Sequence, residues 1–325
     1  MNIPHLLTAP MHIPFRIIPV SAFVFMVAMA ASPTLADDAK AKDHQSLDQA
    51  VDALLKEQGP GVKVGLWVGP AEGEAWYQRN ATDVLPTASS IKAFYLVVFY
   101  ERFKDQLDQP VPGAAKILND DNHPAISHFN EQQRADIRRE LTTASVRKVG
   151  KIMIDSAVTS NAVYNAAANL VTAVLGGPEA LTEAIHRLDP AFKTVMARRY
   201  MLRERTPGDN EATAAAFAAL YQRLATGKLA GIDQATLAAV RKTLFSEKDA
   251  QRGTRYSKGG LLKSDPLTRV NAGWWDTPQG SFVYVVMTAK PIPANPGPND
   301  TIEVLSATTT DLTRLLVEAA RARPK

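Results

Sequence analysis

The sequence contains no cysteine among its 325 residues, which excludes disulfide bonds, thiol catalysis and cysteine-ligated metals. It also lacks a strong excess of either charge, since 37 basic side chains stand against 33 acidic ones and the charges are scattered along the chain. A nucleic-acid-binding surface is therefore not indicated. The hydrophobic share of 46% is typical of a globular protein, and the length is sufficient to bury a large core.

Charged residues are scarce at the N-terminus, where Arg16 is the only one in the first 36 residues. An apolar run at residues 17–31 is followed by small residues, which is the pattern of a cleaved export signal. Because the run is too short for a membrane span, we expect residues 1–36 to be removed. Residues 37–325 would then form a periplasmic or secreted monomer without stable membrane insertion. A retained membrane anchor is the alternative, and Met11 is a second candidate start.

Strand and helix patterns are distributed unevenly along the chain. Alternating apolar residues predict strands near both ends, whereas the long middle is rich in Ala and Leu and is predicted to be helical. We therefore expect an α/β (α+β) fold, in which an antiparallel sheet is built from both chain ends and flanked by helices. An all-helical lobe (about 86–245) is inserted into the sheet lobe (about 45–85 and 246–325), and clefts between lobes are favoured places for a site. The individual predictions are helices at 46–58, 210–229 and 304–323 and strands at 62–68, 75–77, 268–277 and 281–290.

The stretch Ser89-Ser90-Ile91-Lys92 stands at the start of an apolar run. If a helix begins near Ser89, Lys92 lies one turn later on the same face, and the hydroxyl and the amine come within hydrogen-bonding reach. Burial lowers the pKa of a lysine, and a neutral amine can take the serine proton. Backbone N–H groups at the helix start could also stabilise an oxyanion. The pattern predicts Ser89 as a nucleophile and Lys92 as its proton acceptor.

An S-x-x-K pattern is expected about once by chance in a chain of this length. Ser145 and Lys148 form a second copy among other basic residues, and we interpret it as the chance occurrence because its neighbours offer no apolar burial. For Ser89 and Lys92 the alternative is a helix N-cap followed by a lysine whose charged end reaches solvent.

Two further segments carry polar residues that suit such a site. Thr159-Ser160-Asn161 lies in a helix-compatible stretch that ends at Gly-Gly-Pro, and Lys258-Gly259-Gly260 precedes a strand-turn-strand pattern. Together with Ser89 and Lys92, these segments resemble the S-x-x-K, S-D-N and K-T-G motifs of class A β-lactamases and related penicillin-recognising serine hydrolases. The resemblance covers most of the chain after the export signal, in the order of the elements and in the spacing of the motifs.

The resemblance implies catalytic roles for individual residues. Ser89 would be acylated, and Lys92 would accept its proton. Thr159 would pass a proton to the leaving nitrogen, and Asn161 would bind the amide side chain of the substrate. Ser160 would belong to the substrate-binding residues of the same motif.

The resemblance also implies a carboxylate pocket. Lys258 would hold the substrate carboxylate and tune the Thr159 hydroxyl, with Arg269 sharing the carboxylate from the next strand and with Gly259 and Gly260 lining the pocket. An alternative register, Val163-Tyr164-Asn165, fits the distance to Gly-Gly-Pro better. It puts valine where a hydroxyl is needed, so we prefer the register that begins at Thr159.

The sequence departs from the family in the loop before residue 210. Class A β-lactamases carry a glutamate there, which activates the water that hydrolyses the acyl-enzyme. Residues 198–200, two arginines and a tyrosine, occupy the expected place in this chain. Glu204 is out of register, and Glu211 is predicted in the first turn of a helix. We expect neither glutamate to replace the missing base.

These observations predict an exported serine hydrolase that forms an acyl-enzyme on Ser89, with β-lactam hydrolysis as the leading activity and slow deacylation. The alternatives are a D-alanyl peptidase or an amide or ester hydrolase of the same fold, and a periplasmic penicillin-binding or sensing protein without turnover. The expected partner is a small molecule, and no cofactor or metal is implied. His123 and His128 could form a metal pair, but we favour a solvated loop because no third nitrogen ligand has matching spacing. One ring of the adjacent Trp274 and Trp275 is expected to face the core.

Overall fold

The computed structural model describes residues 35–205, 208–250 and 252–323. The chain divides into two units, Met1–Ala39 and Lys40–Lys325, of which the first is described only in its last helical residues. Residues 1–34 of the predicted export signal lie outside the described part of the chain, so the signal stays a prediction. Within the described ranges no helix combines the length and the hydrophobicity of a membrane span.

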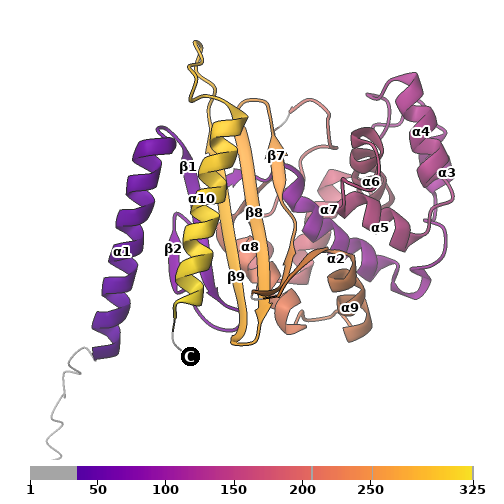
Figure 1. Cartoon of the computed structure of the whole chain (residues 1–325). Helices are drawn as coiled ribbons and strands as arrows, with labels where there is room; N and C mark the ends of the chain where they lie inside the picture. The colour runs from indigo at the N-terminus through magenta and orange to yellow at the C-terminus, as the bar shows by residue number, and fades with distance from the viewer. Residues whose placement is uncertain (1–34, 206–207, 251, 324–325) are drawn as a thin grey trace, which may run out of the picture. The chain divides into compact units, whose positions relative to one another are not determined.

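A seven-stranded antiparallel sheet forms the centre of the second unit (Figure 1). The strand order is β2-β1-β9-β8-β6-β5, and β7 pairs with β8 beside β6. Because β1 pairs along its whole length with β9, with Leu66 opposite Val286, the two ends of the chain meet in one sheet. The prediction of a sheet built from both ends is confirmed. The strands are β1 (Lys63–Pro70), β2 (Tyr77–Arg79), β5 (Phe245–Asp249), β6 (Gly253–Ser257), β7 (Gly260–Leu262), β8 (Leu267–Thr277) and β9 (Gly280–Lys290).

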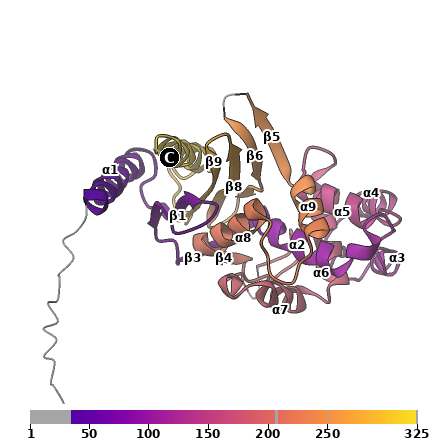
Figure 2. The ribbon, with the colours of Figure 1, turned by 90° about the horizontal axis from the view of Figure 1, so that it is seen from below.

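The two faces of the sheet are covered by different helices. Successive side chains of a strand point to opposite faces, so β9 contributes Tyr284 to one core and Val285 to the other. The first core lies under α10 (Ile302–Arg321), which supplies Leu312, and includes Val51 of α1 (Leu35–Gln58). The second core lies under α8 (Ala214–Thr226), on the other side of the sheet from α10 (Figure 2).

Trp274 and Trp275 follow the same alternation on β8. Trp274 is fully buried on the α8 side, 4.5 Å from Tyr256 and 6.0 Å from Tyr221 between ring centroids. Trp275 is also buried, in the core under α10. Each ring therefore packs into the core on its own face of the sheet.

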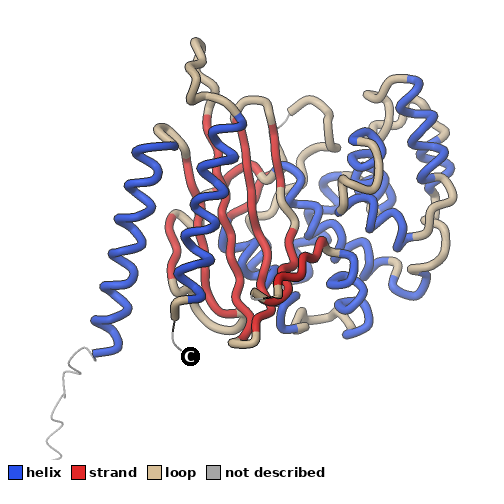
Figure 3. The backbone as a smooth tube through the Cα atoms, viewed as in Figure 1, coloured by secondary structure: helices blue, strands red, loops and turns tan. Residues whose placement is uncertain are grey.

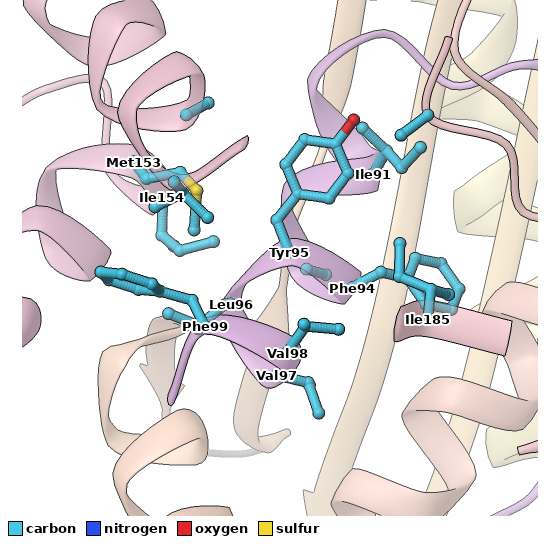
Figure 4. Packing of buried hydrophobic residues seen from close by; sticks show 14 of the residues in the cluster. Ile91, Phe94, Tyr95, Leu96, Val97, Val98, Phe99, Met153, Ile154 and Ile185 are labelled. Atoms are coloured by element: carbon cyan, nitrogen blue, oxygen red, sulfur yellow. The ribbon is translucent and has the colours of Figure 1, made fainter. Parts of the chain in front are cut away.

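The helical region is organised around α2 (Lys92–Arg102). Its apolar side chains are buried on every side, and Figure 4 shows them radiating from the helix in several directions. Phe94, for example, makes edge contacts with Phe192 and Phe217, with centroid distances of 5.2 Å and 5.1 Å. The apolar run after Lys92 correctly predicts a central helix. The surrounding elements are η1 (Ala88–Ile91), η2 (Lys104–Gln106), α3 (Ala114–Leu118), α4 (Glu131–Leu141), α5 (Val146–Ile154), α6 (Asn161–Val174), α7 (Pro178–Leu188), η3 (Pro190–Phe192) and α9 (Gln234–Thr243).

The expectation of an all-helical lobe is wrong at one place, which matters for the site (Figure 3). Strand β4 (Glu211–Thr213) pairs with β3 (Val84–Pro86), so the helix predicted over 210–229 begins only at Ala214. The physical reason is Thr213, whose extended backbone pairs with Val84 while its hydroxyl accepts the N–H of Ala216 as an N-cap. Elsewhere β2 begins two residues later than predicted, and α1 extends well before residue 46.

The glycine at position 260 is required by a close approach between β7 and η1. A Cβ atom there would lie 2.5 Å from the Thr87 carbonyl oxygen and 2.9 Å from the Ser90 nitrogen. Both contacts are with backbone atoms, which cannot rotate away as a side chain would. Gly260 therefore lets the sheet edge lie directly against the turn that carries Ser89.

We expect Gly260→Ala to lower the free energy of unfolding by about 1–3 kcal/mol, because the added methyl group must push β7 and η1 apart. Urea denaturation of the purified protein measures this. Gly297→Ala is the control, since the nearest atom to its Cβ lies at an ordinary 3.6 Å. Equal, small losses in the two variants would contradict the close approach.

Candidate active site

Ser89 lies in η1, immediately before α2, and is half-buried at the edge of a cavity of about 750 Å³. The preceding Ala88 has φ +49°, a left-handed conformation that costs about 1–2 kcal/mol for a residue with a Cβ. Such strain is common at functional sites, where the surrounding structure holds it. The strained turn presents the Ser89 side chain to the cavity one turn before Lys92.

Lys92 is fully buried and its amine has few partners. Its Nζ donates a hydrogen bond of 3.0 Å to Oδ1 of Asn165 and lies 3.2 Å from the ring centroid of Tyr164. Burial, and secondly the positive charge of Lys258, hold the pKa of Lys92 well below its ordinary value. Because its pKa is lowered in this way, the Lys92 amine loses its proton more readily than an exposed lysine and is a candidate proton acceptor.

The second amine at the site belongs to Lys258, which is also largely buried. Its Nζ donates to the Gly259 carbonyl at 3.0 Å and lies 5.4 Å from the centroid of the Tyr164 ring. The Tyr164 ring therefore lies near both amines, while Gly259 and Gly260 line the cavity beside them. The S-x-x-K and K-G-G segments come together at one cavity.

The segment 159–161 does not lie where the preferred register requires it. Thr159 lines a different cavity, together with Ser145 of the second S-x-x-K copy. The Ser160 hydroxyl accepts the N–H of Val163 as the N-cap of α6. Because α6 begins at Asn161, the two residues before it lie at the helix end and not on the face towards Lys92. We therefore withdraw Thr159 and Ser160 as site residues.

The alternative register, 163–165, fits the geometry. Asn165 binds Lys92, and Asn161 lines the cavity one helical turn earlier, where its Oδ1 accepts a bond of 3.0 Å from Nδ2 of Asn165. Val163 is buried and has no hydroxyl, so the polar side chain beside both lysines is Tyr164. The sequence analysis missed this role of Tyr164, although a tyrosine and an asparagine on an otherwise apolar helix are a usable signal.

Arg269 also lines the cavity, on β8 opposite Leu261 of β7. Its Nε is buried without a hydrogen-bond partner, and burial lowers the pKa of its guanidinium from the ordinary value. No carboxylate of the described residues lies within ion-pair distance of Arg269. Its predicted place near Lys258 and Gly259 agrees with this geometry, and the free guanidinium suits an anionic group.

The described residues 197–205 and 208–210, here called the loop, supply several lining residues of the cavity and are held by buried polar contacts. Arg199 pairs with Asp209 at 2.8 Å, and both side chains are at most 9% exposed. The Asn169 side chain of α6 makes two hydrogen bonds to the loop backbone. Its Nδ2 donates to the Met201 carbonyl at 3.2 Å, and its Oδ1 accepts the Met201 N–H at 2.6 Å. Asn210 joins the loop to η1, because its carbonyl accepts the N–H of Thr87.

The charged groups that line the cavity are mainly positive. Asp209 is the only carboxylate among the lining residues that the structure describes, and Arg199 and Arg205 hold it at 2.8 Å and 3.3 Å. Glu204 lines a different cavity, and Glu211, in β4 and not in a helix, pairs with Arg198. The cationic lining residues are Arg199, Arg203, Arg205, Lys258, Lys263 and Arg269.

The two histidines of the polar loop, His123 and His128, make different contacts. His123 accepts the N–H of Ala125 through its Nδ1 at 3.1 Å, which fixes the turn. The ring of His128 packs on Phe129 with a centroid distance of 4.2 Å.

Comparison with known proteins places this geometry among related folds. A family profile described as the β-lactamase enzyme family matches residues 46–313. No match was found among curated proteins. The β-lactamase of Sphaerobacter thermophilus is 19% identical with a TM-score of 0.62, covering 86% of this chain and 98% of its own. The β-lactamase of Streptomyces albus G is 17% identical with a TM-score of 0.58, covering 84% and 98%.

A third similar structure is a mutant of PBP-A in an acyl-enzyme complex with penicillin G. It is 17% identical with a TM-score of 0.61, and the match covers 86% of this chain and 97% of that protein. At these identities the structural matches establish the fold, which is the β-lactamase and transpeptidase fold that the motifs predict.

The buried amine of Lys92 makes stability depend on pH. Its pKa is lower in the folded protein than in the unfolded chain, so the unfolded chain binds more protons and stability increases as pH rises towards 10.5. We expect the free energy of unfolding of the wild type, relative to Lys92→Met, to rise by up to about 1.4 kcal/mol per pH unit in this range. Urea denaturation at several pH values measures the difference.

Lys116→Met is the control for exchanging an exposed lysine. Wild type and Lys92→Met profiles that stay parallel between neutral pH and 10 would show that the amine is charged in the folded protein.

Proposed function

Because the chain belongs to the β-lactamase enzyme family, we propose that it is a serine hydrolase that forms an acyl-enzyme on Ser89 with β-lactam amides. The single observation that carries this proposal is the Lys92 amine, buried one turn from Ser89 and held below its ordinary pKa. A serine hydroxyl is a weak nucleophile until a nearby base takes its proton, and a neutral amine in a desolvated site is such a base.

Acylation then proceeds with a simple proton balance. Ser89 Oγ attacks the lactam carbonyl carbon as its proton passes to Lys92 Nζ, and backbone N–H groups of η1 stabilise the oxyanion. The carbon–nitrogen bond breaks, and the leaving nitrogen takes up a proton that Lys92 gives back. Tyr164, whose ring lies near both amines, packs against the two groups that carry charge in this step.

The substrate carboxylate belongs, in this proposal, at the end of the cavity formed by Lys258 and Arg269. Both side chains line the cavity, and the remaining lining charges are mainly positive. An anionic substrate is therefore favoured over a neutral one of the same shape. Gly259 and Gly260 give the substrate access to the backbone of the sheet edge, and Asn161 lines the opposite wall.

Deacylation lacks an evident base. Among the lining residues that the structure describes, the one carboxylate is Asp209, and two guanidinium groups already hold it at 2.8 Å and 3.3 Å. We therefore propose slow hydrolysis of the acyl-enzyme. A penicillin-binding or sensing protein without turnover is the second candidate function. The lack of an evident base in the loop that carries Asp209 favours it. In either case we propose export after removal of residues 1–36.

The nucleophile can be identified by mass. Incubation of the purified protein with benzylpenicillin should add one β-lactam mass, and peptide mapping should locate it on Ser89. Ser89→Ala should abolish the adduct. Ser145→Ala is the matched control from the second S-x-x-K copy and should be acylated like the wild type. An adduct on another serine, or none with any β-lactam or activated ester, would refute the proposal.

The kinetics test the missing base. A chromogenic β-lactam should give a burst of one product per enzyme, followed by steady turnover about 10²–10⁴-fold slower than acylation. Met201→Glu, which adds a carboxylate on the cavity side of the loop, should speed the slow phase, whereas its neutral counterpart Met201→Gln should not. Glu204→Gln should change little. Fast turnover that Glu204→Gln or Asp209→Asn abolishes would show that a base is present after all.

A further inference from the structure

A second cavity, of about 510 Å³, lies between the sheet and α10, on the face away from α8. Figure 1 shows α10 lying over the sheet beside β8 and β9. The sheet side of the cavity is lined mainly by residues of β6 and β8. Among the described residues that line it, five are arginines and one, Glu318, carries a carboxylate. The arginines are Arg252, Arg255, Arg269, Arg314 and Arg321.

The arginines are only partly neutralised by neighbouring acids. Arg252 pairs with Asp249, Arg255 with Glu247 and Arg314 with Asp311. Arg269 and Arg321 have no carboxylate within ion-pair distance among the described residues. The cavity therefore keeps positive charge that the protein does not compensate.

Two hydrogen-bond donors in this cavity have no acceptor. The Nε atoms of Arg255 and Arg269 are buried, and neither has a hydrogen-bond partner in the described part of the chain. Leaving a buried donor of a charged group unsatisfied costs about 1–3 kcal/mol or more. Each of these donors lies at the wall of the cavity and is explained if the cavity admits an acceptor.

Two of the guanidinium groups lie against an aromatic ring of the cavity wall. Arg255 and Arg321 lie against the ring of Trp275, with Cζ-to-centroid distances of 6.0 Å and 5.6 Å. Trp275 itself is only 6% exposed and cannot move freely. Asn271 of β8 donates to the Thr313 hydroxyl of α10 at 3.1 Å, which ties the helix to the sheet beside the arginines. Stacking on a buried ring restricts the Arg255 and Arg321 guanidinium groups, which lowers the ordering cost of binding an anion.

We propose that this cavity binds a small anion carrying at least two negative charges, of the phosphate, sulfate or polycarboxylate type. The planar guanidinium group donates two parallel hydrogen bonds to such oxyanions, and Arg255 and Arg321 present two such groups beside the same ring. The volume suits a small molecule and not a macromolecule. This site is separate from the proposed acylation reaction, although Gly259 and Arg269 line both cavities.

Isothermal titration calorimetry tests the site on the full chain, with ionic strength held constant by sodium chloride. Sulfate, which is a dianion at every pH used, should bind saturably with one anion per chain. Arg321→Gln should raise the dissociation constant for sulfate about tenfold, because one charge-assisted contact is lost. Arg321→Lys should recover part of the lost affinity. Phosphate and citrate titrations then show whether inorganic or carboxylate oxyanions bind more tightly.

Two control variants locate the site. Arg139→Gln removes an exposed arginine that pairs with Asp136 on α4 and should leave sulfate binding unchanged. Arg203→Gln removes a cation from the cavity beside Ser89 and should also leave it unchanged. Arg269 is kept in all variants because it also belongs to the proposed substrate pocket. Melting temperatures in chloride buffer check that each variant is folded.

The proposal is overturned if sulfate gives no saturable heat, or if folded Arg321→Gln binds sulfate as tightly as the wild type. It is also overturned if Arg203→Gln alone abolishes binding, because the anion would then lie beside Ser89. None of these measurements requires acylation, so failure of the anion site and failure of the serine hydrolase proposal are distinguishable.

Discussion

The burial of the Lys92 amine is the constraint on which the arrangement of the site depends. An amine in the apolar centre of the helical region is stable only if a polar partner reaches it, and α6 supplies that partner through Asn165. This requirement fixes the rotation of α6 against α2 and brings the Tyr164 ring beside both lysines. Because Lys258 comes from the sheet, the same small region joins the helices to the sheet edge. Burial lowers the pKa of Lys92, which suits a proton acceptor, and the same burial of an amine lowers the stability of the fold.

A second set of contacts joins the Ser89 turn to the loop that closes the cavity. The short sheet of β3 and β4 continues into the bonds from Thr87 to the Asn210 carbonyl, so the Ser89 turn and the loop share one backbone framework. Asn169 and the Arg199–Asp209 pair then hold the loop from the helical side. A loop anchored in this way can present catalytic groups in fixed positions. In this chain the groups it presents to the cavity are mainly cations, which suits the capture of an anion better than the activation of water.

Positive charge is concentrated in two cavities, although the net charge of the molecule is small. A net charge of +4 over 325 residues is unremarkable, yet cations dominate the linings of the cavity beside Ser89 and of the cavity under α10. Arg269 belongs to both linings and has no ion pair among the described residues. Uncompensated guanidinium groups cost stability when they are half-buried, and ligand binding is the usual reason for such a cost.

The sequence by itself determined the elements that depend on local pattern. Alternation at both ends predicts the sheet, the apolar run after Lys92 predicts a buried central helix, and the three-residue spacing to Ser89 predicts the pair at its start, because helix and strand periods are properties of short segments. The tertiary structure decided which polar residues meet that pair. Whether Thr159 or Tyr164 lies beside Lys92 depends on where α6 begins, and this is set by the Ser160 cap and by packing against α2. The β3–β4 pairing, the grip of Asn169 on Met201 and the arginine cavity join segments far apart in the chain, so no local pattern contains them.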